Sequence, residues 1–399
     1  MYFGLGNLYL SAAMKRRGVN VCVADFRAIP AGVLPPADFY GFSVTTPQVS
    51  AAKELAREVK GKTIVGGPHA SLLPESCIGS FDYVVKGEGE YVLWDILCDK
   101  EQPGLVTAPR IDNLDRLPYP DWDAVAAPFS SSLYDGERYG LGELSAAVIT
   151  SRGCPWSCSF CGNLFRNPTR FRGVANIIGE VQELVKRDVK RLRFVDDNFT
   201  LHPDFANLCN QLSQQGITYR AHTRSNLMTE GKANLLALSG CQECSLGVES
   251  ADERVLKLNN KGEKVEAHRR ATQILKQAGI KVKYYWMSGL PGESDETIEL
   301  NKAFMKELQP DKWTLSTFAP YPGCDVFANP DKYNVEITNH DWQNWWNFVF
   351  NVRGLDLPGR NGYVHVLKGQ TQEQMKARHD DLYDYLLKGK WKTEAAYVT

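Results

Sequence analysis

The 399-residue sequence lacks the features that mark several large classes of protein. No apolar run approaches the ~20 residues that a membrane-spanning helix needs, and residues 1–6 do not resemble a signal peptide. The 46 basic and 47 acidic side chains leave a net charge of −1, which gives no field for holding nucleic acid or an anionic membrane surface. No repeats or low-complexity segments occur. We therefore expect a cytoplasmic protein with neither a nucleic-acid nor a membrane partner.

The composition is that of ordinary globular protein, with 43% hydrophobic and 23% charged residues. At ~150 residues per domain, the length suggests two or three domains. The ten cysteines are not expected to form disulfides in a reducing compartment, so the question is which of them hold a metal.

Three cysteines form a compact motif. Cys154, Cys158 and Cys161 make a C-x3-C-x2-C run that follows an apolar strand predicted at 145–150. A structural zinc site is one alternative, but it needs a fourth ligand, usually in a second pair at zinc-finger spacing. Three thiolates with an open position favour a [4Fe–4S] cluster whose fourth iron binds something else. We interpret the other seven as small buried residues: Cys22, Cys77, Cys98, Cys209, Cys241, Cys244 and Cys324.

The motif resembles the signature of the radical S-adenosylmethionine (SAM) superfamily, with Phe160 as the aromatic residue before the last cysteine. In that superfamily the amino and carboxylate groups of SAM chelate the open iron. An electron from the reduced cluster then cleaves the sulfonium and yields a 5′-deoxyadenosyl radical. The resemblance implies a [4Fe–4S] cluster, SAM and an electron donor such as flavodoxin or ferredoxin.

Strands and helices alternate from residue 145 to about 325, which indicates a parallel sheet. Six βα units are too few for a closed eight-fold barrel, and the resemblance implies a partial (β/α)6 TIM-like barrel with function at the carboxyl ends of the strands. The predicted strands are 145–150, 191–196, 218–223, 243–248, 281–287 and 313–319. The predicted helices are 174–186, 203–215, 232–238, 266–278 and 294–308.

Polar residues follow these strands one after another. Each of them taken alone is equally well explained as a helix cap. Carboxylates at the end of the second strand are suitable partners for an ammonium group, and a guanidinium at the end of the third suits a carboxylate or a ribose. The resemblance assigns SAM contacts to Phe160, Gly162, Asp196, Asp197, Asn198, Arg224, Glu249, Ser250 and Pro291.

The first 100 residues show a second, shorter alternation, with strands predicted at 21–25, 40–44, 63–65 and 83–85. This order is typical of a Rossmann-like, doubly wound domain with ligand loops at the strand carboxyl ends. The runs Gly-Gly-Pro-His-Ala and Lys-Gly-Glu-Gly-Glu resemble those of the cobalamin-binding domain in cobalamin-dependent radical SAM enzymes. Glycines there let the backbone approach a bulky ligand, and hydroxyls face its polar tail. The implied cobalamin contacts are Ser43, Thr45, Thr46, Gly66, Gly67, Pro68, His69, Gly87 and Glu88.

The front domain departs from that family in two respects. No Asp-x-His-x-x-Gly run occurs, so no histidine of that motif is present to bind cobalt. The first predicted element is a helix at 4–17, where such a domain has a strand first. Either the protein begins upstream, or the domain has lost a strand and part of its cobalamin cradle. His69 either approaches the corrin or caps the next helix.

The predicted organisation is a cobalamin-binding-like domain at 1–105, a linker at 106–143, the radical SAM core at 144–325 and a mostly helical region at 326–399. We expect the last region to cover the barrel as a substrate-side or lid element. A helix is predicted at 341–350, with Trp342, Trp345 and Trp346 at helical spacing beside Phe348, and another at 371–387.

The leading hypothesis is a cobalamin-dependent radical SAM methyltransferase that acts on an unactivated carbon of a small molecule or peptide. The first alternative keeps the radical chemistry without cobalamin, as an oxidoreductase, mutase or epimerase with a vestigial front domain. A third hypothesis, from another class, is a non-catalytic iron–sulfur or zinc-binding interaction module. Nothing in the sequence identifies the substrate.

Overall fold

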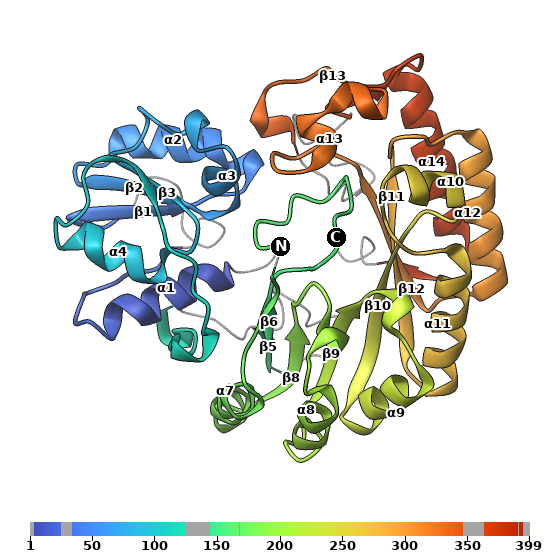
Figure 1. Cartoon of the computed structure of the whole chain (residues 1–399), viewed down its shortest axis with the longest axis horizontal. Coiled ribbons are helices and arrows are strands. Elements are labelled where there is room, and N and C mark those ends of the chain that lie inside the picture. The colour runs from blue at the N-terminus through green and yellow to red at the C-terminus, as the bar shows by residue number, and fades with distance from the viewer. Residues whose placement is uncertain are drawn as a thin grey trace. The chain divides into compact units, whose positions relative to one another are not determined.

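The structure is a computed structural model that describes residues 4–24, 34–124, 144–166, 168–345, 363–389 and 391–393. The chain divides into two compact units, residues 1–146 and 147–399 (Figure 1). Within the described ranges, no helix combines the length and apolar character needed to cross a membrane.

The first unit is a four-stranded sheet flanked by helices. All its strand pairs are parallel, and the strands lie in chain order. Its core comes from alternate strand positions and one face of the last helix, including Ile64, Tyr83, Val85, Ile96 and Val106. The predicted Rossmann-like fold is thus confirmed. The elements are α1 (Leu5–Lys15), β1 (Phe39–Ser43), α2 (Val49–Glu58), β2 (Lys62–Gly66), α3 (Gly67–Leu72), β3 (Tyr83–Lys86), α4 (Gly89–Leu97) and β4 (Gly104–Thr107).

The strand predicted at 21–25 is wrong over the residues that are described. Residues 21–24 form no strand, and Asp25 lies outside the described residues. Val21 and Val23 are only half-buried and Cys22 is exposed, so this segment has no buried face that would pack it as a strand. Cys98 is also exposed, whereas the other five cysteines outside the motif are buried as predicted.

The second unit contains the predicted partial barrel. Six strands lie side by side in chain order, and the short β15 (Lys392–Thr393) pairs in parallel with the last of them. The helices line the outer side of this curved sheet (Figure 1). The strands are β5 (Leu144–Val148), β8 (Val189–Phe194), β9 (Thr218–Thr223), β10 (Cys241–Glu249), β11 (Lys281–Ser288) and β12 (Lys312–Thr317). The outer helices are α7 (Val174–Lys186), α8 (Phe205–Leu212), α9 (Glu230–Leu238), α11 (Val265–Gln277) and α12 (Asp295–Leu308).

Strand periodicity divides the side chains between the two faces of the sheet. In β11, Tyr284 and Trp286 pack against Phe304 of α12, with ring centroids 5.9 and 6.1 Å away. Lys283 and Tyr285, which alternate with these residues along β11, therefore face the inner side. β9 to β12 end on the polar residues Thr223, Glu249, Ser288 and Thr317.

The last part of the chain packs around a small antiparallel pair, β13 (Val335–Ile337) and β14 (His365–Leu367), between α13 (Asp325–Ala328) and α14 (Gln372–Lys388). The predicted final helix corresponds to α14. The helix predicted at 341–350 is not present where it is described: Trp342–Asn344 forms one 3-10 turn. Trp345 is fully buried, and its indole N–H donates to the carbonyl of Asn339 at 3.0 Å, which ends the turn. Trp346 and Phe348 lie outside the described residues.

Candidate functional site

The cysteine motif lies on a loop between the antiparallel pair β6 (Ser151–Arg152) and β7 (Arg170–Phe171). At Gly153, φ is +108° and an added Cβ would lie 2.1 Å from the carbonyl oxygen of Phe165, so only glycine allows the two ends of the loop to approach. Arg166 donates to the carbonyls of Cys158, at 3.2 Å, and Cys161. These contacts hold the loop through its backbone and leave the sulfurs to other partners.

Three of the predicted SAM contacts, from the ends of two strands, contact this loop. After β8, Asn198 donates through Nδ2 to the Sγ of Cys154 at 3.4 Å. Also after β8, Asp197 accepts a 2.8 Å bond from Asn163. After β9, Arg224 donates through Nη1 to the Sγ of Cys158 at 3.6 Å.

Asp196 links the end of β8 to the residues that follow β5. Its Oδ1 accepts hydrogen bonds from the backbone N–H of Thr150 (2.8 Å), the hydroxyl of Thr150 (2.9 Å) and the hydroxyl of Ser151 (2.7 Å). Burial raises the pKa of Asp196, against the effect of these donors. Its Oδ2 is buried without a partner, so one oxygen positions the loop and the other is open to a ligand.

A buried group of four charges lies beside the loop, and two of its members were not predicted. Lys261 lies 3.4 Å from Glu249 and 3.4 Å from Glu263, and Glu263 lies 3.3 Å from Arg224. Burial raises the pKa of Glu249, against the attraction of Lys261. Although burial opposes the charge of Lys261, the two glutamates raise its pKa. The four groups are therefore two cations and two carboxylates in mutual contact.

Lys261 and Glu263 follow the short helix α10 (Glu253–Leu258), in a turn where Asn260 and Gly262 have positive φ. The sequence signal for this turn is Asn-Asn-Lys-Gly, which predicts a helix end and not a site. Only the fold brings it to the cysteine loop, where the N–H of Ser159 donates to the carbonyl of Asn259 at 2.9 Å.

The predicted residues Glu249, Ser250 and Pro291 form the rim of the site. Glu249 has a φ of +62° at an irregularity in the β10–β11 register. The hydroxyl of Ser250 accepts a 3.1 Å bond from the N–H of Asp252, the residue that caps α10. The carbonyl of Pro291 accepts a 2.9 Å bond from Asn259.

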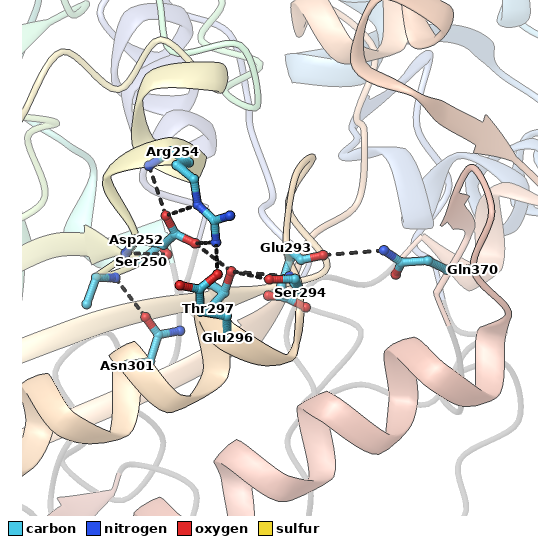
Figure 2. Close-up of polar contacts among 10 residues, drawn as sticks. Ser250, Asp252, Arg254, Glu293, Ser294, Glu296, Thr297, Asn301 and Gln370 are labelled. Carbon is cyan, nitrogen blue, oxygen red and sulfur yellow. Dashed lines mark hydrogen bonds and ion pairs between the residues drawn. The ribbon is translucent and has the colours of Figure 1, made fainter.

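Behind this rim, hydrogen bonds connect α10 to the start of α12 (Figure 2). Asp252 accepts from the guanidinium of Arg254 and, at 2.8 Å, from the hydroxyl of Thr297. The Nε2 of Gln370 lies 3.4 Å from the carbonyl of Glu293. Burial raises the pKa of Glu293 to about 7, although the hydrogen bond that its carboxylate accepts from the N–H of Gly289 lowers the pKa.

Phe160 and Gly162 complete the predicted set on the loop itself. The Phe160 ring packs against the apolar cluster that contains Leu290 and Phe318, and its centroid lies 6.0 Å from Lys261 Nζ. An added Cβ at Gly162 would lie 3.1 Å from the carbonyl of Pro322, so this glycine permits close packing against the turn after β12.

The donor set fits a [4Fe–4S] cluster and SAM. Among the described residues, no group of three or more His, Cys, Asp or Glu side chains is arranged to hold a single metal ion, whereas the cysteines of such a cluster are spread over its iron atoms. Burial raises the pKa of Cys154, and that of Cys161 to about 12, so these thiols need a cation to become thiolates. Buried polar atoms without partners also face the loop, among them Asn198 Oδ1 and Arg224 Nε.

In the first unit, the predicted cobalamin contacts lie at adjacent carboxyl ends of β1, β2 and β3. Gly67, with a φ of +89°, passes so close to Val44 that an added Cβ would lie 2.8 Å from its backbone nitrogen. The N–H of Gly87 donates to the hydroxyl of Ser71 at 3.0 Å. Gly66 has open space at its Cβ position, with the nearest atom 3.9 Å away. At this glycine-lined edge, the backbone can lie close to a bulky planar ligand.

Some predicted side chains point into the domain instead. His69 is buried, with Nδ1 3.1 Å from the hydroxyl of Thr46 and Nε2 2.8 Å from that of Ser76. Both ring nitrogens are occupied, so His69 is not available to ligate cobalt. Glu88 is also buried, and its Oε2 accepts a 2.8 Å bond from the N–H of Ile111. Thr45, by contrast, is exposed and bonds Gln48 in a capping box. The nine predicted cobalamin contacts stay predictions.

Comparison with known protein families agrees with this geometry. The sequence profile of the radical SAM superfamily matches residues 148–304. The chain therefore contains a radical SAM domain. A B12 binding domain matches residues 2–97, ahead of the radical SAM domain. The cofactors of these two domains are a [4Fe–4S] cluster, SAM and cobalamin.

The chain is similar to curated relatives along most of its length. An uncharacterized methyltransferase of Pyrococcus horikoshii is 28% identical, in a match covering 78% of this chain and 72% of the relative. The bacteriochlorophyllide d C-12(1)-methyltransferase of Chlorobaculum tepidum is 24% identical, with coverage of 92% and 81%. An anaerobic magnesium-protoporphyrin IX monomethyl ester cyclase of Rubrivivax gelatinosus is 28% identical, and the match covers 80% of this chain and 63% of the cyclase.

Among solved structures, the radical SAM methyltransferase TsrM from Kitasatospora setae, with cobalamin and a [4Fe–4S] cluster bound, has a similar fold. Its TM-score is 0.68 at 16% identity, with coverage of 96% of this chain and 88% of TsrM. At this identity the likeness concerns the fold alone.

Proposed function

We propose that the protein is a cobalamin-dependent radical SAM methyltransferase that transfers a methyl group to an unactivated carbon of a small molecule. The observation that carries the proposal is the convergence of Asn198 and Arg224 on the cysteine loop, in a chain that also contains a B12 binding domain. Methyltransferases among the relatives support this class of reaction.

The chain's own residues bind and position the reactants. Cys154, Cys158 and Cys161 would hold the cluster, which would supply the electron for radical formation from SAM. Asp196 Oδ2 and Asn198 Oδ1 are buried acceptors without partners, which suits the ammonium of SAM. The half-buried Phe160 packs on an apolar cluster beside the cysteines, which would limit the access of water to the reacting centre.

The electron donor and the cellular setting are part of the same proposal. A one-electron donor such as flavodoxin or ferredoxin would reduce the cluster. A cytoplasmic location suits ten free cysteines, because a reducing compartment keeps them as thiols.

The experiment that tests this function is anaerobic purification after expression with cobalamin, followed by reaction with SAM and dithionite. The absorption spectrum reports cluster and corrinoid separately, and chromatography reports 5′-deoxyadenosine and S-adenosylhomocysteine. We expect both cofactors and both products, and Cys158→Ala should yield no 5′-deoxyadenosine. Protein that retains the cluster but no corrinoid, and that forms 5′-deoxyadenosine alone, would instead support an oxidation, rearrangement or epimerisation.

A further inference from the structure

The guanidinium of Arg224 is held on several sides by groups of the protein itself. It stacks over the indole of Trp156 at 4.4 Å, and Trp156 belongs to the cysteine loop. Its Nη1 donates to Cys158 Sγ at 3.6 Å. Its Nη2 donates to the carbonyl of Lys261 and lies 3.3 Å from Glu263. Of its donor nitrogens, only Nε is without a partner.

This arrangement differs from the sequence-based assignment of Arg224 to the carboxylate or ribose of SAM. A guanidinium that binds a carboxylate in a bidentate manner donates to it from two nitrogens. Here both terminal nitrogens are directed at the cysteine loop and the α10 turn. With its side chain 7% exposed, Arg224 has little freedom to turn elsewhere.

We propose that Arg224 is a positioning residue that sets the reduction potential of the cluster through Cys158, and that Glu263 opposes it. An N–H donor and a positive charge beside a cysteine sulfur stabilise the reduced, more negative cluster and so raise its potential. Because the side chains of Arg224 and Glu263 are 7% and 0% exposed, solvent screens these charges little.

The two residues therefore predict shifts of opposite sign. Arg224→Met removes the donor and the cation and should lower the midpoint potential. Glu263→Gln removes the opposing charge and should raise the midpoint potential. The new side chain keeps an oxygen that can accept the N–H of Asn226, which lies 3.0 Å from Glu263 Oε1. Arg224→Lys keeps the charge but loses the planar fork and the stacking, so its potential should lie between those of Arg224→Met and the wild type.

The test is a redox titration of the reconstituted, SAM-free protein, followed by electron paramagnetic resonance, with iron and sulfide measured for each variant. The matched control is Arg269→Met, which removes an arginine of α11 that pairs with Glu266 and Glu307 and does not touch the cysteine loop. Its potential should equal that of the wild type. Because no substrate or SAM is present, the result is independent of the reaction catalysed.

A lowered potential in Arg224→Met and a raised one in Glu263→Gln would support the proposal. An unchanged potential in fully loaded Arg224→Met, with weakened SAM binding, would overturn it and restore the sequence-based assignment. If Arg224→Met loads poorly, Glu263→Gln decides: a raised potential supports the proposal, and an unchanged or lowered one overturns it. Wild-type protein that assembled no cluster would overturn both this inference and the proposed function.

Discussion

The side-chain amide of Asn198 donates to the sulfur of Cys154 across 3.4 Å, although the two residues are 44 positions apart in the sequence. This contact joins the end of β8 to the first residue of the cysteine motif. The oxygen of the same amide, Oδ1, is buried without a partner. Asn198 therefore has one group directed at a cluster ligand and one available to SAM.

Replacing Asn198 by alanine should lower 5′-deoxyadenosine formation by about 10- to 100-fold, because partners of metal ligands typically contribute that much to affinity or activity. The measurement is the rate per assembled cluster under dithionite, with iron content determined in parallel. Asn207→Ala on α8 is the control, since Asn207 is exposed and its side chain bonds Asp204 and Gln211 of the same helix region. Equal rates in both variants would contradict the role of Asn198.

Asp196→Ala should destabilise the second unit by about 3 kcal/mol, because it orphans three buried donors on Thr150 and Ser151. The measurement is the free energy of unfolding from urea titrations of the cluster-free protein. Asp331→Ala, which removes an exposed carboxylate paired with Lys368, should change stability by less than about 0.5 kcal/mol. A similar small effect of Asp196→Ala would show that the loop does not depend on it.

Gly67→Ala should reduce bound corrinoid while iron content stays at the wild-type level. An added Cβ at this positive-φ position would lie 2.8 Å from the nitrogen of Val44 and push the β1 and β2 loops apart. Gly41→Ala in β1 is the matched control, because no atom lies within 4 Å of its added Cβ. Corrinoid and iron are both read from the purified protein. Full corrinoid content in Gly67→Ala would argue against this edge as the cobalamin site.

Glu293 predicts a pH dependence of stability. Its pKa is about 7 in the folded protein, against 4.5 for an ordinary glutamate, because the carboxyl is buried. The folded state thus binds the proton more tightly, and the free energy of unfolding should fall as pH rises from about 4.5 to about 7, by about 3 kcal/mol at full extent. Glu293→Gln keeps an acceptor for the N–H of Gly289 and removes this slope. Urea unfolding at pH 5 and pH 8 tests the prediction. Relative to the wild type, the urea midpoint of the variant should be higher at pH 8 than at pH 5. A difference between variant and wild type that is the same at both pH values would contradict the prediction.

Much of the second unit follows from sequence pattern. The helix predicted at 174–186 coincides with α7, and the strand predicted at 281–287 with β11 to within one residue. Both segments have strong periodicity and are buried on the sides that the pattern indicates. The cysteine motif was evident from spacing alone, because three thiols on one short loop have few other uses.

Other features depend on contacts that spacing does not reveal. Lys261 and Glu263 follow a helix end, and only the close approach of the α10 turn to Ser159 brings them to the site. His69 has the sequence of a ligand loop, yet Thr46 and Ser76 bind both of its ring nitrogens. The aromatic spacing at 341–345 resembled a helix, but burial of Trp345 favours a single turn.

The central claim is that one protein uses both SAM cleavage and cobalamin. It is tested most directly by quantifying S-adenosylhomocysteine and 5′-deoxyadenosine from reduced, corrinoid-loaded protein in the absence of any substrate. The proposed function predicts about one molecule of S-adenosylhomocysteine per bound corrinoid, in addition to 5′-deoxyadenosine that requires Cys158. Formation of 5′-deoxyadenosine without S-adenosylhomocysteine, in protein that carries corrinoid, would contradict it.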